Sequence, residues 1–310
     1  VGWMKNKAYV NIGGGAMGIM GSFCDTQVLQ KYLGIRAEWV DMTEIKRRVD
    51  FGIYDHEEYE RVRKFIRESV KEGKDWNGTA FEQKDFTRAE IEMVPAYKAV
   101  DIGLDRSLVG AYGQDDRVCA YSELTALLDS NDTAKTVFAV LADKEETGSD
   151  GVSGMQSEIF ADILAEVYEA KGANYRVVKA NSKCLSADVN AAYDPNFPEV
   201  LEKKNACYAN CGVGLSKFTG ARGKSGTSDA TSEFTAYVRS FLNKNGVVWQ
   251  MAELGKVDQG GGGTVAKFIA NMNIDTIDVG VPVISMHAPY EAISKLDLYM
   301  TYKAFCAFIG

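Results

Sequence analysis

The sequence has little histidine and no excess of positive charge. Of its 310 residues only 2 are histidine, and Asp and Glu together number 43 against 35 Lys and Arg, a net charge of −8. Proteins that bind nucleic-acid phosphates or anionic lipid without a specific site need clustered Lys and Arg. We therefore expect no nucleic-acid partner. The charge balance does not exclude basic or metal-bridged small substrates.

Long apolar runs are missing as well. No stretch of about eighteen apolar residues is present, and no charged segment followed by an apolar one resembles a leader. The sequence thus predicts neither a membrane partner nor a secretory signal, and the expected location is the cytoplasm.

The cysteines do not form a framework of pairs. Only two of them lie close together, in the stretch CYANC, and no second Cys or His pair completes a structural zinc site. We expect ordinary buried or half-buried thiols in a reducing compartment. The six are Cys24, Cys119, Cys184, Cys207, Cys211 and Cys306.

What is present is ordinary for a globular protein of one large or two modest domains, with 46% hydrophobic and 25% charged residues. Its first part alternates strand and helix patterns, which predicts a β-α-β-α segment. The predicted strands are residues 7–15 and 37–43, and the predicted helices are residues 26–34 and 57–73.

A polar, aperiodic stretch at 74–85 is the best candidate for a boundary, and we divide the chain into 1–77 and 78–310. Strand and helix patterns alternate again beyond it, which predicts an α/β fold with a mostly parallel or mixed sheet flanked by helices. The predicted strands are 135–142, a strand-like segment closing at 188, 247–253 and 274–285, and the predicted helices are 115–130, 157–172, 231–246 and the C-terminus.

Two adjacent carboxylates, Glu145 and Glu146, follow the predicted strand TVFAVLA. In open α/β sheets ligands lie beyond the carboxyl ends of the strands, so acids at such an end are candidates for chemistry. Neighbours on a strand point in opposite directions, so one could bind a metal while the other faces a substrate water. A solvated turn is the alternative.

Further candidate side chains stand at comparable places. Asp188 and His287 each close an apolar segment, and Asp115 and Asp116 precede a helical pattern. Taken alone, His287 would be interpreted as a half-buried side chain, and Asp115 and Asp116 as the N-cap of a helix. Together with the Glu pair they form a carboxylate-rich, single-histidine set of the kind that binds two hydrolytic metal ions.

Residues 87–310 resemble the aspartyl aminopeptidase family of di-zinc metallopeptidases. The resemblance implies two zinc ions, a peptide substrate with an acidic N-terminal residue and a homo-oligomer. The motifs that carry it, in order, are GAYGQDDRVCAY, ADKEETGS, SADVNAAYDPN, KFTGARGKSGTSDA, GGGGTVAK and SMHAPYE.

The resemblance also implies a role for each matching residue. Asp115 would bridge the metals, Glu145 would be the general base, Glu146 and His287 would bind one zinc, and Asp188 the other. Two further residues are implied as contacts of the substrate's carboxylate, in a loop where small residues surround Lys and Arg: Lys217 and Thr264.

The chain departs from the family in three respects. Asp116 stands where the family usually has Asn, and the chain lacks the His-x-Asp motif that supplies the remaining zinc ligand and the inserted lid. Its other histidine, His56 in IYDHEEYE, starts an amphipathic pattern and is expected to be solvated. We therefore expect one tightly bound zinc and a second that is weak or absent.

Residues 3–77 resemble instead an internal segment of L-fucose isomerase, through GAMGIMGS and VDMTEIKRR. The chain thus looks like a mosaic, although that family's catalytic carboxylates have no counterpart in the segment. The glycines at 13–15 fit a tight turn better than a dinucleotide site. An isomerase-related protein and a non-catalytic α/β scaffold are the alternative functions.

Overall fold

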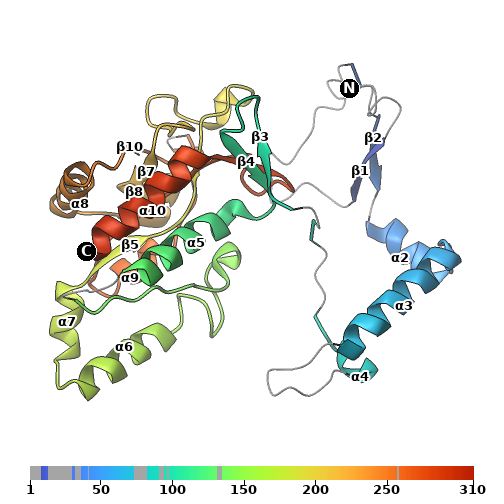
Figure 1. Cartoon of the computed structure of the whole chain (residues 1–310), viewed down its shortest axis with the longest axis horizontal. Helices are drawn as coiled ribbons and strands as arrows, with labels where there is room; N and C mark the ends of the chain where they lie inside the picture. The colour runs from blue at the N-terminus through green and yellow to red at the C-terminus, as the bar shows by residue number, and fades with distance from the viewer. Residues whose placement is uncertain are drawn as a thin grey trace. The chain divides into compact units, whose positions relative to one another are not determined.

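The structure, a computed structural model, divides into two units, residues 1–96 and 97–310 (Figure 1). The boundary expected at 77/78 remains a prediction. Within the chain the structure describes residues 8–12, 30–31, 36–40, 42–72, 82–90, 94–95, 98–130, 135–256 and 258–310.

The first unit contains a pair of parallel strands followed by charged helices. Strand β1 (Ala8–Ile12) pairs in register with β2 (Arg36–Val40), as the sequence patterns predict. Helices α2 (Met42–Asp50), α3 (His56–Glu72) and α4 (Gln83–Phe86) follow. Ion pairs three and four residues apart stabilise α2 and α3. The helix predicted at 26–34 lies almost entirely outside the described residues.

Two mixed sheets form the centre of the second unit. One has the order β10-β7-β11-β5 and the other β3-β4-β13-β12-β6, and a hairpin β8-β9 stands apart. The strands of the first sheet are β5 (Lys183–Ser186), β7 (Val213–Ser216), β10 (Trp249–Met251) and β11 (Asp275–Gly280). Those of the second are β3 (Val100–Ile102), β4 (Leu108–Ala111), β6 (Asn190–Ala191), β12 (Pro282–Ile284) and β13 (Glu291–Ser294). The hairpin consists of β8 (Phe218–Ala221) and β9 (Ser225–Asp229).

Two strands of the first sheet lead directly into strands of the second. Strand β5 is followed along the chain by β6, and β11 is followed by β12. Both pairs, β5 with β11 and β6 with β12, are parallel. Strand β7 lies antiparallel to β11, so the sheet is mixed. This confirms the predicted α/β class and places the carboxyl end of β5 beside β11, where Ser186 pairs with Asp278.

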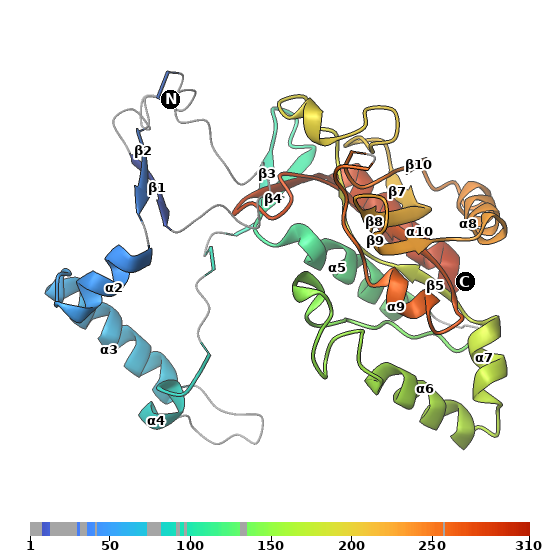
Figure 2. The same ribbon diagram turned by 180° about the vertical axis from the view of Figure 1, so that it is seen from behind.

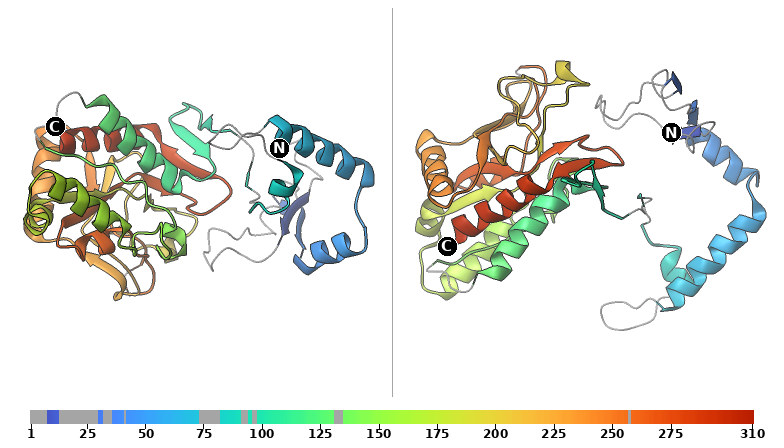
Figure 3. Two further views of the ribbon diagram at one scale, coloured as in Figure 1. Left: turned by 90° about the horizontal axis from the view of Figure 1, so that it is seen from below. Right: turned by 45° about the horizontal axis from the view of Figure 1, so that its top comes forward.

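Helices cover the first sheet with their apolar sides. The main core joins α5 (Gln114–Asp129), α8 (Ser232–Lys244) and α10 (Lys295–Ile309) to β7 and β11, and α5 and α10 run side by side (Figure 3). The remaining helices are α6 (Ile159–Ala170), α7 (Tyr175–Asn181), α9 (Ala266–Ala270) and the short 3₁₀ helices η4 (Glu145–Thr147) and η5 (Pro198–Val200).

One predicted strand is wrong. Residues 135–142 form no strand, and the segment runs between α5 and α6 as a thin line (Figure 2). Its β-branched and apolar residues favour a strand only when a partner strand is available, since β propensity is largely a measure of packing. The segment at 175–188 likewise divides into helix α7 and strand β5.

None of the helices among the described residues is long and apolar enough to span a bilayer. The described cysteines are free thiols, and Cys119 and Cys207 are buried.

Candidate metal centre

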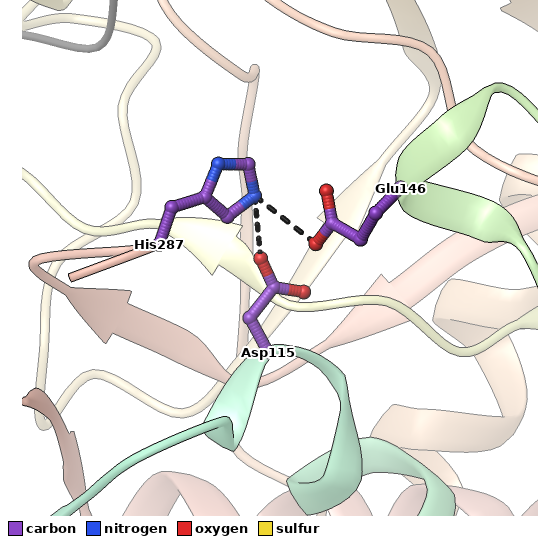
Figure 4. A group of neighbouring side chains, drawn as sticks. All are labelled: Asp115, Glu146 and His287. Atoms are coloured by element: carbon purple, nitrogen blue, oxygen red, sulfur yellow. Dashed lines mark ion pairs between the residues drawn. The ribbon is translucent and has the colours of Figure 1, made fainter. Parts of the chain in front are cut away.

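Three side chains from distant parts of the chain meet at one point. Asp115 comes from the start of α5, Glu146 from η4 and His287 from the loop between β12 and β13 (Figure 4). Nε2 of His287 lies 2.9 Å from Oδ2 of Asp115 and 3.2 Å from Oε1 of Glu146. The structure thus brings together three of the residues predicted as metal ligands.

A second cluster adjoins the first. The carboxylates of Asp115, Asp116 and Asp188 each offer an oxygen within 4.8 Å of the others, and Asp115 belongs to both clusters. Asp188 is two residues beyond β5, at the carboxyl end of that strand, where the sequence placed it. The sequence placed Asp116 in the same acid set as Asp115, and the resemblance assigned the shared ligand position to Asp115 and gave Asp116 no role of its own.

The local backbone explains how both aspartates reach the site. Helix α5 formally begins at Gln114, but Asp115 and Asp116 have non-helical dihedral angles and a cis peptide bond joins them. The N-cap of the helix is Gly113, with no side-chain cap. Since Asp115 and Asp116 are non-helical residues just before the regular turns of α5, the alternative interpretation of the acid pair as an N-cap stays a prediction.

Glu145 and Glu146 lie on a 3₁₀ turn, because the preceding segment is not a strand. The expected alternation along a strand is therefore wrong as the reason for their different directions. The two side chains nevertheless differ in surroundings, since Glu146 contacts His287 while Glu145 is half-buried and makes no such contact.

The site concentrates negative charge in a partly buried place. Burial, with Asp115 close by, raises the pKa of Asp116 to about 8, and burial raises the pKa of Asp188. Burial and the neighbouring Glu146 raise the pKa of Glu145 to about 7. Hydrogen bonds to Asp115 and Glu146 raise the pKa of His287 to about 10, and the bond from His287 lowers the pKa of Glu146.

The donor set of the first cluster fits zinc. One imidazole nitrogen and two carboxylate oxygens lie within 4.8 Å of one another, close to the spread of ligands held at about 2 Å from one ion. Two buried polar atoms, Oδ1 of Asp116 and Nδ1 of His287, have no hydrogen-bond partner among the described residues. Among the described residues, the second cluster offers only carboxylate oxygens.

Glu291 holds the backbone beneath these ligands, a function that no sequence pattern indicated. Its carboxylate, 1% exposed, accepts the backbone N–H of Asp115 at 3.1 Å and that of His287 at 2.8 Å. Gln114 donates to the carbonyl of Glu291 at 2.8 Å. The sequence offered one signal for this role, because an acidic residue, Glu291, stands at the first position of the buried strand β13.

The two residues predicted to contact substrate, Lys217 and Thr264, stay predictions, and each has a contact within the chain. Lys217 forms an ion pair with Asp229 across the β8-β9 hairpin, and Thr264 is buried just before α9, where its hydroxyl accepts the N–H of Ala266. Neither lines the cavity that contains the acid clusters. His56 is exposed at the start of α3, as predicted.

Comparison with known proteins identifies the family. Residues 37–309 match the model of "Aminopeptidase I zinc metalloprotease (M18)". A probable M18 family aminopeptidase 1 of Clostridium acetobutylicum is 46% identical over 261 residues, 83% of this chain and 55% of that protein.

Solved structures agree. The crystal structure of aminopeptidase I from Clostridium acetobutylicum gives a TM-score of 0.70 at 46% identity, over 79% of this chain and 52% of that one. The structure of the Saccharomyces cerevisiae mApe1 dodecamer gives a TM-score of 0.58 at 28% identity, over 69% of this chain and 48% of that one. The chain spans about half the length of these relatives. It belongs to the M18 family of zinc metalloproteases.

Proposed function

We propose that this chain carries the catalytic metal centre of a zinc-dependent aminopeptidase that removes acidic N-terminal residues from peptides. The observation that supports this most is the meeting of Asp115, Glu146 and His287 beside a half-buried Glu145 that is not engaged by the histidine. Since the chain spans about half of its relatives, activity of the chain alone is part of the proposal.

In this proposal Glu146 and His287 would hold one zinc, Asp188 would hold the second, and Asp115 would be shared by the two sites. Asp116 would contribute to the second site, because it lies in the same cluster. Zinc, when bound, polarises the scissile carbonyl and makes a water molecule more acidic. An oxygen-only second site binds zinc more weakly than a site with imidazole, so we expect unequal occupancy.

Glu145 is the proposed general base. A carboxylate beside the metal can accept a proton from water and return it to the leaving amine. Burial and the neighbouring acids raise the pKa of Glu145 to about 7, and a bound cation would lower it. Its position next to Glu146 in sequence places it beside the metal without using it as a ligand.

The acidic preference is a proposal from resemblance. Lys217 would bind the substrate's carboxylate with ammonium donors that its ion pair with Asp229 leaves over, and Thr264 would donate its O–H while its oxygen still accepts the N–H of Ala266. Assembly into a homo-oligomer, as in the yeast dodecamer, and a cytoplasmic location are proposed on the same basis.

The origin of residues 1–77 is a separate proposal. The likeness to L-fucose isomerase stays a prediction, and the family match from residue 37 onward favours a junction nearer the N-terminus. A sugar isomerase is not favoured as the function, because the acid clusters all lie beyond residue 97.

The paired variants Glu145→Gln and Glu146→Gln test the proposal. The first should retain zinc and lose about 10²–10⁴ in rate, because it removes proton transfer alone. The second should release zinc, because a neutral amide is a poorer ligand than a carboxylate. Zinc per chain by elemental analysis is measured beside release of the N-terminal residue from an acidic peptide.

If both variants hold as much zinc as the parent chain, the pair is a solvated turn and the proposed centre is wrong. Zinc release by the second variant without any peptidase activity in the parent would favour the non-catalytic scaffold.

A further inference from the structure

The short helix η4, which carries the proposed base and a proposed zinc ligand, belongs to a loop that is held together by its own residues. The hydroxyl of Ser153 donates to the carboxylate of Asp143 at 2.6 Å, and Asp143 forms a bridge with Gly154. The backbone N–H of Gln156 donates to the carbonyl of Ser149 at 3.1 Å. Both partners of each contact lie within the loop, so these contacts fix its shape and not its place beside α5.

Residues 136–142 lead into this loop and are attached to two helices. Among the described residues, one hydrogen bond links them to another element, and in it the backbone N–H of Val140 donates to Oε1 of Glu123 on α5 at 3.1 Å. The ring of Phe138 also lies edge-on to that of Tyr168 on α6, with the ring centroids 6.3 Å apart. A ring contact tolerates sliding, whereas a hydrogen bond depends on distance and angle, so the bond to Glu123 is the contact that fixes the position of the segment.

Glu123 stands where three elements that carry acids of the site come together. It lies about two turns along α5 from Asp116. Burial and then the nearby charge of Glu123 raise the pKa of the Cys184 thiol to about 12, so Glu123 also lies close to β5, the strand that leads to Asp188. Val140, which it binds, precedes η4. One carboxylate therefore contacts or faces the elements that supply both acid clusters.

The surroundings of Glu123 do not otherwise favour an acid. It is half-buried, and within the described chain it accepts a hydrogen bond but forms no ion pair. Burial raises the pKa of Glu123 to about 7, and the N–H of Val140 acts in the opposite direction. Burying a polar group costs free energy unless it is hydrogen-bonded, so an apolar side chain would suit this place better if only space had to be filled. The bond to Val140 therefore accounts for an acid here.

We propose that Glu123 is a positioning residue of the metal centre. Its carboxylate holds residues 136–142 against α5 and thereby sets where η4 places Glu146 as a zinc ligand and Glu145 as the base. Glu123 is outside both acid clusters, and it acts through the backbone and not by touching metal or substrate. The inference rests on the proposed function, because it assigns a further residue to the same centre.

Two variants of the full chain test this, Glu123→Met and Glu123→Gln. Both remove the negative charge, but only glutamine keeps a side-chain oxygen that can accept the N–H of Val140. In Glu123→Met, amide exchange in 136–142 should become about fivefold to tenfold faster and zinc affinity about fivefold to tenfold weaker, as expected for the loss of one hydrogen bond. Glu123→Gln should stay within about twofold of the parent chain in both measurements, because the bond is retained.

Zinc affinity is measured by competition with a chelating dye and exchange by mass spectrometry, and Glu166→Met, at an exposed acid of α6, is the control that should change neither. Equal losses of zinc affinity in Glu123→Met and Glu123→Gln would attribute the effect to charge and overturn the proposal. Faster exchange throughout the chain at unchanged zinc affinity would restrict Glu123 to general stability and overturn it too. A parent chain that binds no zinc would refute the proposed function and this inference with it, whereas a zinc-binding parent with an unaffected Glu123→Met would refute this inference alone.

Discussion

At the scale of single residues, the candidate metal centre is supported by a carboxylate that belongs to neither acid cluster. Glu291 fixes two backbone N–H groups, those of Asp115 and His287, with the two oxygens of one side chain. His287 has a φ of 63°, in the left-handed region that non-glycine residues rarely adopt. The bond from its N–H to Glu291 therefore holds a conformation that the residue alone does not favour.

The variant Glu291→Gln should weaken zinc binding by about 10–100-fold, the usual effect of removing support behind a ligand. The backbone N–H of either Asp115 or His287 would then face the NH₂ group of the new amide instead of an acceptor oxygen. That ligand would lose its fixed position. Zinc affinity is measured by competition with a chelating dye, with circular dichroism to verify the fold. Glu253→Gln, which alters a half-buried acceptor of Asn205 away from the clusters, is the control and should keep the parent's affinity.

An unchanged zinc affinity in Glu291→Gln would restrict Glu291 to holding the fold. Equal losses in both variants would indicate a general loss of stability.

Much of the centre was predictable residue by residue. Asp115, Glu146 and His287 meet as the motifs indicate, although the strand predicted before Glu146 is absent. Asp116 and Glu291 were not predictable in their roles, since these depend on a non-helical first turn of α5 and on the register of β13 with β4. Such features arise from tertiary packing and leave no periodic signal.

At the scale of elements, helices were predicted more reliably than strands. Helix α6 is amphipathic, and α8 and α10 have side-chain N-caps; these three and α5 lie where the patterns placed them. The segment 135–142 failed, because a strand needs a neighbour to complete its hydrogen bonds. The sequence of one segment does not tell whether that neighbour is present.

Helix α10 is connected to the loop before β7 through a buried acid. Both oxygens of Asp297, which is 0% exposed, accept backbone N–H groups at 2.6 Å, from Asn210 and from Gly212. Burial raises the pKa of Asp297 to about 6. The folded pKa lies above the ordinary value of 3.8, so this group's stabilisation is complete below about pH 4 and is lost as the pH rises through 6.

The parent chain should therefore exceed Asp297→Asn in unfolding free energy by more at pH 4 than at pH 7, with a change of about 2 kcal/mol. Urea unfolding of both proteins at the two pH values measures it, and other titrating groups cancel in the difference. If the difference in unfolding free energy between the parent chain and Asp297→Asn increases with pH, the folded protein favours the ionised carboxylate, contrary to the prediction.

At the scale of the whole molecule, the net charge of −8 is distributed unevenly. Five carboxylates, those of Asp115, Asp116, Glu145, Glu146 and Asp188, lie in or beside the two clusters, with His287 as the histidine among them. Without a bound cation, such a group of acids opposes folding once its members ionise. The stability of the protein should therefore depend on metal and pH together.

With a chelator present, the melting temperature should fall as the pH rises from 6 to 8.5. The pKa values of Glu145, about 7, and Asp116, about 8, exceed their ordinary values, so the stability that these groups contribute at low pH is lost as the pH rises through 7 and 8. Zinc at about a hundred times its dissociation constant should restore about 2.7 kcal/mol, and more of the difference should appear at pH 8.5, where the ligands are deprotonated. Thermal unfolding in EDTA and in zinc across this range measures both curves, and the zinc-loaded protein controls for effects of pH elsewhere. Parallel curves would mean that the acids are already neutralised by protein groups, and that the clusters do not act as a cation site.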